Sequence, residues 1–139
     1  MGRILGIDFG MKRIGLALSD PSKIIASPLK SLQAGKSLEQ TADLILLELT
    51  GVESIVLGLP LLLSGKDSET TETVRKFAAI LEAKSQLPLI LWDERLTTTQ
   101  VEKILKEGNM RRKKRAQHLD TMSATLILQS YLDRMHHGS

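Results

Sequence analysis

The chain of 139 residues contains no cysteine, and aromatic residues make up only 3% of it. Without cysteine there is no disulfide and no thiolate metal site, which is typical of a reducing compartment. Because aromatics are scarce, aliphatic side chains must fill the core, and base stacking on single strands is not the favoured mode of recognition. No apolar run approaches the roughly 20 residues that span a bilayer, and Asp8 interrupts the N-terminal apolar stretch that a signal peptide needs. We therefore expect a cytoplasmic protein.

Histidine chemistry and glycine-rich phosphate loops are also lacking. The sequence has three histidines, of which His118 stands alone and His136 and His137 come close to the C-terminus. No H-E-x-x-H motif, serine–histidine–aspartate set or glycine-rich phosphate-binding motif is apparent. Carboxylates are therefore the remaining candidates for chemistry.

Apolar periodicity divides the chain into short strands and amphipathic helices. Tight turns join the first three strands into an antiparallel meander, whereas helices between the later strands give parallel pairing. We therefore predict one α/β domain over residues 1–135, with a mixed five-stranded sheet flanked by helices, and a short tail over 136–139. The predicted strands are 4–9, 13–19, 24–29, 54–59 and 87–92. The predicted helices are 38–49, 99–108 and 119–135, together with one that contains 74–81 and is capped by Asp67 or Ser68.

Asp8 lies inside an otherwise apolar strand, where a carboxylate is costly unless it is paired or bound to a metal. By strand alternation it shares a face with Ile4 and Gly6. The structural alternative is an aspartate satisfied by backbone donors near Gly10. We favour the functional interpretation because acids are rarely buried without a partner.

Further acids follow the last strand and begin the last predicted helix. Asp93 and Glu94 end the fifth strand, and strand ends of this kind border the ligand crevice in α/β sheets. Because the two point to opposite faces, only one of them faces such a site, and the sequence leaves open which. Asp120 shares a helical stripe with Ala124 and Ile127. Taken alone, Asp120 is read as a helix cap or a partner of the helix dipole.

Taken together, these acids predict a metal site at one edge of the sheet. The first strand, the last strand and the last helix each contribute one carboxylate there. Oxygen ligands without cysteine or histidine suit Mg²⁺ or Mn²⁺. Two such ions can activate a water molecule and stabilise the leaving oxygen in phosphodiester hydrolysis.

The net charge is +3, and five of the basic residues form one unbroken run, Arg111, Arg112, Lys113, Lys114 and Arg115. One interpretation is contact with nucleic-acid phosphates. The other is a solvated loop. The run alone does not decide between them.

Several collinear stretches over nearly the whole chain resemble the YqgF family, also called RuvX. The most distinctive is Asp93–Thr98, which reads D-E-R-L-T-T. The others are Gly6–Gly10 with Lys12–Gly15, Gly58–Pro60, Val74–Phe77, and Lys113–Lys114 with Asp120 and Ile127–Leu132. Any one of them would be weak evidence, but so many in the same order are specific.

This resemblance implies a ribonuclease H-like fold and a nuclease akin to Holliday-junction resolvases, also linked to maturing the 5′ end of precursor small-subunit ribosomal RNA. It implies an acidic site of Asp8, Glu94 and Asp120 holding Mg²⁺ or Mn²⁺. Its expected partners are structured RNA or branched DNA, and ribosome-assembly intermediates. The nucleic-acid contacts that it implies are Lys12, Arg13, Arg95 and Arg111, Arg112, Lys113, Lys114 and Arg115, with Thr97 and Thr98 in support.

The sequence departs from the family after Pro60. The family usually has a polar, Asn-containing loop there, whereas this chain has Leu61–Leu63 followed by Ser64 and Gly65. The departure puts the substrate contacts of this loop in doubt, but it removes none of the predicted metal ligands.

Two other functions stay open. A non-catalytic nucleic-acid-binding factor of ribosome assembly is supported equally well by the basic run. A phosphotransferase is suggested because an early D-x-G also resembles the first phosphate loop of actin-like and sugar kinases, although 139 residues would then need a dimer. Phosphate contacts alone do not separate RNA from DNA, and resolving a four-way junction would favour a two-fold homodimer.

Overall fold

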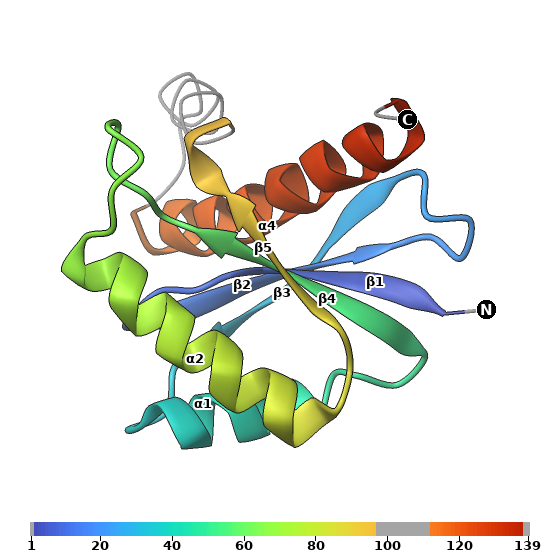
Figure 1. Cartoon of the computed structure of the whole chain (residues 1–139). Helices are drawn as coiled ribbons and strands as arrows, with labels where there is room; N and C mark the ends of the chain where they lie inside the picture. The colour runs from blue at the N-terminus through green and yellow to red at the C-terminus, as the bar shows by residue number, and fades with distance from the viewer. Residues whose placement is uncertain (1, 97–111, 138–139) are drawn as a thin grey trace.

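A computed structural model describes residues 2–96 and 112–137 of the chain (Figure 1). The chain alternates strands and helices in the order that the apolar periodicity predicts. The elements are β1 (Arg3–Asp8), β2 (Arg13–Ser19), β3 (Ala26–Gln33), α1 (Leu38–Leu46), β4 (Val52–Leu59), α2 (Glu69–Ser85), β5 (Leu89–Asp93), the 3-10 helix η1 (Glu94–Leu96) and α4 (Arg112–His137). None of the described helices is long and apolar enough to cross a bilayer.

The five strands form one mixed sheet in the order β3-β2-β1-β4-β5. The hairpins pair β1 with β2 and β2 with β3 in antiparallel fashion, whereas β4 runs parallel to both β1 and β5. This confirms the predicted α/β class and the mixed sheet. Because β1 is the central strand, its carboxyl end lies between neighbours on both sides, and Asp8 stands at that end.

The helices form a layer on each face of the sheet. Helices α1 and α2 pack together on one face, and α4 crosses the other (Figure 1). One buried cluster, which includes Leu5, Ile7 and Phe77, lies under α1 and α2. The second, which includes Ile4 and Leu128, lies under α4. Ile4, Gly6 and Asp8 share one face of β1, as predicted, and that face is the one covered by α4.

The close approach of α4 to the sheet depends on Gly15 of β2. A β-carbon at this position would lie 1.9 Å from the backbone carbonyl oxygen of Asp120. Such a separation is far below van der Waals contact, so any larger residue would push the helix away. The absence of a side chain here thus sets the height of Asp120 above the sheet.

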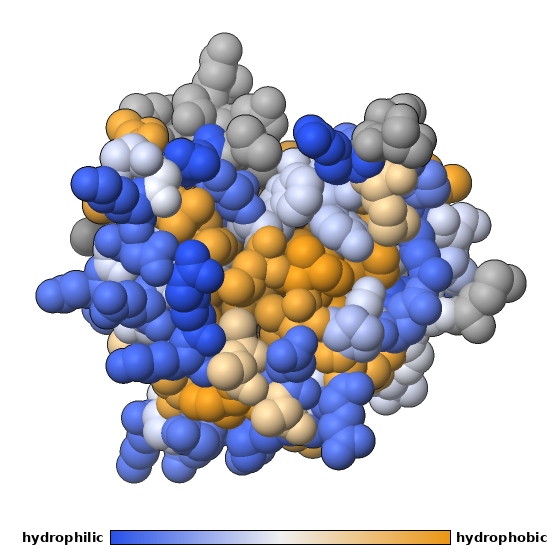
Figure 2. Space-filling view, in the orientation of Figure 1, coloured by the Kyte–Doolittle hydropathy of each residue, from blue (hydrophilic) through white to orange (hydrophobic). Residues whose placement is uncertain are grey.

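Strand β5 forms one edge of the sheet. All five of its residues are partly exposed. Figure 2 shows hydrophobic side chains gathered in the middle of the face on which β5 lies, with hydrophilic ones around them. Trp92 of β5 is anchored on the α4 side, where its indole Nε1 donates to Ser130 Oγ at 3.1 Å.

The third strand was predicted over 24–29, but β3 begins at Ala26 and continues past Pro28 to Gln33. Because β3 is an edge strand that pairs only with β2, a residue without an N–H is tolerated there, and a register shift between Leu16 and Ala17 accommodates it. Helix α2 begins after Ser68, whose hydroxyl accepts from the backbone N–H of Thr71 in a capping box. This confirms Ser68 as one of the two expected caps.

Helix α4 differs more. It begins at Arg112, so the backbone of residues 112–115 is helical rather than a loop. Asp120 lies well inside the helix, which rules out its role as an N-cap. The helix also continues through His137, beyond the expected start of a tail, and His136 Nε2 lies 2.8 Å from the carbonyl oxygen of Lys23. The helix predicted over 99–108 lies outside the described residues.

Candidate active site

Asp8 is the last residue of β1 and faces α4. Burial raises the pKa of its carboxyl well above the usual value, and a hydrogen bond and the charge of Glu94 raise it further. The charge of Asp120 acts in the same direction, whereas a hydrogen bond from Ser123 opposes these effects. The structure therefore brings the three predicted acids close enough together to interact electrostatically.

Glu94, rather than Asp93, faces Asp8. It lies in η1, directly after β5, and its side chain fits over Gly58 of β4. A β-carbon at Gly58 would lie 2.8 Å from Glu94 Cγ, so the glycine makes room for the glutamate. Burial raises the pKa of Glu94 and the charge of Asp93 adds to this, while the hydrogen bond with Asp8 opposes the shift.

Asp93 is occupied by a different partner. Its carboxylate makes a forked ion pair with Arg95, with Nη2 at 2.6 Å and Nε at 2.8 Å from Oδ2. This guanidinium holds the pKa of Asp93 below its usual value. Arg95 also donates from Nη1 to the carbonyl oxygen of Leu63 at 3.3 Å. Arg95 therefore ties the end of β5 to the loop after β4.

Asp120 enters the site from α4, and one of its oxygens accepts two hydrogen bonds. Arg13 Nε in β2 lies 2.8 Å from Asp120 Oδ2, and Ser31 Oγ in β3 lies 3.0 Å from the same atom. The Asp120 side chain is only 15% exposed. Its carboxylate is thus held against β2 and β3, beside the pair formed by Asp8 and Glu94.

Carboxylates are the type of ligand that hard divalent cations prefer. The charges of the other two carboxylates raise the pKa of Asp8, and a bound cation would relieve this repulsion. As the side chains lie, however, no three acidic or imidazole groups within residues 2–96 and 112–137 are arranged as a metal-binding group. Asp8 and Glu94 are hydrogen-bonded to each other, and Asp120 is turned to Arg13 and Ser31.

The basic residues predicted to contact nucleic acid are only partly described. Lys12 is exposed in the turn between β1 and β2, while Arg13 and Arg95 form ion pairs with Asp120 and Asp93. Arg111, Thr97 and Thr98 lie outside the described residues. For Arg112, Lys113, Lys114 and Arg115, the described part is the helical backbone.

Sequence reasoning missed the polar residues that hold the acids in place. Ser123 follows Asp120 by one helical turn, so the helical period alone places both on one face. Ser31 had no such signal, because the third strand was predicted to end at residue 29. Only the continuation of β3 brings Ser31 next to α4.

The loop after β4 and the pocket beyond Asp8 carry none of the three acids. In the loop, the Leu62 N–H donates to the carbonyl oxygen of Lys66 at 3.0 Å, and Leu63 is 94% exposed.

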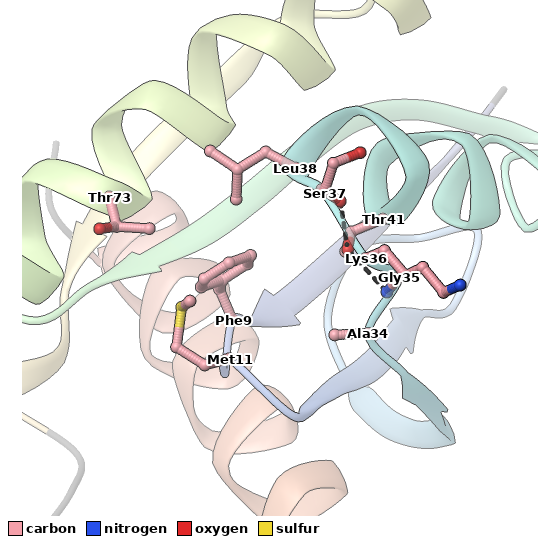
Figure 3. Close-up of a pocket in the computed structure, with 9 residues that line it drawn as sticks. All are labelled: Phe9, Met11, Ala34, Gly35, Lys36, Ser37, Leu38, Thr41 and Thr73. Carbon is pink, nitrogen blue, oxygen red and sulfur yellow. Dashed lines mark hydrogen bonds between the residues drawn. The ribbon is translucent and has the colours of Figure 1, made fainter.

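The pocket, of about 210 Å³, lies on the α1 and α2 side of the sheet (Figure 3). There Thr41 Oγ1 accepts from the Gly35 N–H and donates to the Ser37 carbonyl oxygen. The pocket is lined by Phe9, Met11, Ala34, Gly35, Lys36, Ser37, Leu38, Thr41 and Thr73.

The strand order, the mixed pairing and the acidic side chains at the sheet edge define the ribonuclease H-like class of α/β domains. The solved structure of Thermus thermophilus RuvC in complex with a Holliday junction substrate shares this fold, with a TM-score of 0.61 at 12% identity over 99% of this chain and 98% of that one. The RuvX family, described as Holliday junction resolvase, matches residues 2–134. The chain therefore belongs to the RuvX family.

Curated relatives agree with this assignment over nearly their full length. A protein of Protochlamydia amoebophila (strain UWE25) is 48% identical over 139 residues, covering 94% of this chain and 93% of the relative. A protein of Koribacter versatilis (strain Ellin345) is 47% identical over 134 residues, covering 96% and 88%. Both are named as candidate pre-16S rRNA nucleases.

Proposed function

We propose that this chain is a metal-dependent endonuclease that hydrolyses phosphodiester bonds, acting in 5′-end maturation of precursor small-subunit ribosomal RNA, in Holliday-junction resolution, or in both. One observation carries the proposal. A carboxyl group sits at the end of the central strand, and its pKa is raised by burial and by two further acids from separate elements. Acids forced together in this way are typical of functional sites. The names of the family and of its curated relatives support the same activity.

In this proposal Asp8, Glu94 and Asp120 hold Mg²⁺ or Mn²⁺, with two ions as the expected number. The bound ions would supply an activated water and stabilise charge on the leaving oxygen. Burial raises the pKa of both Asp8 and Glu94, and a bound cation would oppose that shift by favouring their charged forms.

The substrate in this proposal is structured RNA or branched DNA, reached in the cytoplasm and, for RNA, within ribosome-assembly intermediates. Lys12 and Arg13 stand on the strand and turn next to Asp8, where they can contact the flanking phosphates. In this proposal the basic run at the start of α4, Arg112–Arg115, also binds nucleic-acid phosphates.

The decisive experiment incubates wild type and Asp8→Asn with two labelled substrates, precursor ribosomal RNA and a four-way DNA junction. Each reaction contains Mn²⁺, Mg²⁺ or EDTA. We expect wild type to cleave at least one substrate in the presence of a divalent ion and Asp8→Asn to cleave neither. Asp8→Asn should bind the substrate as tightly or more tightly, because a negative charge near phosphate is lost.

Two results would argue against the proposal. If Asp8→Asn and Glu94→Gln cut as fast as wild type, the acids are structural. If neither substrate is cut although both proteins bind tightly, the chain is a nucleic-acid-binding factor of ribosome assembly. Glu48→Gln is a matched control, because Glu48 pairs with Lys30 away from the three acids. This variant should cleave at the wild-type rate.

A further inference from the structure

The carboxylate of Asp120 is held on a single oxygen by donors from two neighbouring strands. Arg13 Nε and Ser31 Oγ both donate to Oδ2, at 2.8 Å and 3.0 Å. The Asp120 side chain is 15% exposed, whereas that of Arg13 is 40% exposed. The contact itself is therefore largely shielded, while the guanidinium can still reach a ligand from solvent.

These two bonds compete with the metal site. A carboxylate oxygen has two main lone-pair directions, and Oδ2 already accepts two hydrogen bonds, from Arg13 and Ser31. The guanidinium also offsets the negative charge that would attract a cation. This agrees with the finding that no three acids in the described residues stand as a metal-binding group, although Asp120 lies beside Asp8 and Glu94.

We propose that Arg13 and Ser31 form a latch that keeps Asp120 out of the metal site until a phosphodiester binds, and that Ser31 is a positioning residue for Asp120. A phosphate offers the planar guanidinium of Arg13 two charged oxygens in the geometry that it binds best. When Arg13 turns to the phosphate, Asp120 keeps only the weaker bond from Ser31 and can turn toward the cation. Nucleic acid and metal then bind with positive coupling. This inference rests on the proposed function.

Ser31→Ala tests the latch without changing any charge. We expect this variant to bind Mn²⁺ at least about ten-fold more tightly than wild type in calorimetric titrations without nucleic acid, because one hydrogen bond to a charged group no longer has to be broken. Ser27→Ala is the matched control, since Ser27 is exposed on the same strand, and it should bind Mn²⁺ like wild type. The double variant Ser31→Ala/Asp120→Asn should lose the gain, because the freed ligand is gone.

The coupling is measured by repeating the titrations with a phosphorothioate RNA duplex, which keeps the backbone charge and resists hydrolysis. The duplex should tighten Mn²⁺ binding by wild type more than binding by Ser31→Ala, in which the latch is already weakened. If wild type binds Mn²⁺ and Ser31→Ala binds it equally or more weakly, the latch is wrong while the nuclease proposal stands. If neither protein binds Mn²⁺ at millimolar concentrations, the metal site and the latch are both overturned.

Discussion

Replacing Gly15 by alanine should disturb both the stability of the protein and its site, because this glycine is the point at which α4 rests on β2. The added β-carbon would lie 1.9 Å from the backbone carbonyl oxygen of Asp120 and 2.3 Å from the carbonyl carbon. Ordinary van der Waals contact begins near 3.4 Å. The helix and the strand must therefore separate locally by about 1.5 Å.

The cost follows from what resists that separation. The atoms in the way belong to the backbone of a helix, so no side chain can rotate aside. Forcing an extra methyl group into a packed interior costs about 1–3 kcal/mol of unfolding free energy, and we expect the upper end of this range. The shift also moves Asp120, and a displacement of about 1 Å in a catalytic site can lower a rate about 100-fold.

Urea denaturation of Gly15→Ala and wild type measures the first effect, and the cleavage assay measures the second. Gly51→Ala is the control, because Gly51 has φ +75° and nothing within 4 Å of the added atom. It should cost only the left-handed backbone penalty of about 1–2 kcal/mol and keep wild-type cleavage. If Gly15→Ala unfolds at the wild-type urea midpoint and cleaves at full rate, the contact between α4 and Gly15 controls neither stability nor the position of Asp120.

Two further predictions concern pH and helix capping. Burial and Glu94 raise the pKa of Asp8 in the folded protein, so ionisation of Asp8 destabilises the fold. The contribution of Asp8 to the unfolding free energy is fully present below its unfolded pKa of about 3.9 and is lost as pH rises through its folded pKa. In EDTA, the unfolding free energy of Asp8→Asn relative to wild type should therefore increase from about pH 4 upward, and a difference that does not vary with pH would contradict this. Ser68→Ala should lower the unfolding free energy by about 1 kcal/mol through loss of the α2 cap, whereas the exposed Ser27→Ala should change it by less than about 0.5 kcal/mol. Equal urea midpoints for these two variants would show that the cap contributes nothing.

Much of the fold could be predicted because the local pattern and the final environment agree. The alternation in Arg13–Ser19 gave β2 with its bounds, and the apolar run before Pro60 gave β4. The errors came where a neighbour decides the outcome. A proline is not tolerated inside a central strand, but an edge strand such as β3 can include Pro28. The edge position of β3 is a property of the whole sheet.

The start of α4 was missed for a similar reason. The residues Arg112–Arg115 carry no apolar period, so nothing in their own sequence indicates a helix. Their backbone is helical as the first turns of a longer helix that is anchored further along, where Ala124 and Leu128 are buried against the sheet. Such anchoring by packing commonly outweighs weak local preference.

The sequence by itself determined the α/β class, the order of the elements and the acids worth testing, with Asp93 and Glu94 as alternatives, because hydrophobic periods and residue chemistry are local. The tertiary structure decided how those acids are arranged. The parallel register that pairs Leu59 with Asp93 places Glu94 over Gly58, and the small size of Gly15 lets α4 bring Asp120 down beside Asp8. It also set Arg13 and Ser31 on one oxygen of Asp120. These contacts join residues as far as 107 positions apart in the chain, and only strand pairing and helix packing bring such residues within hydrogen-bonding distance.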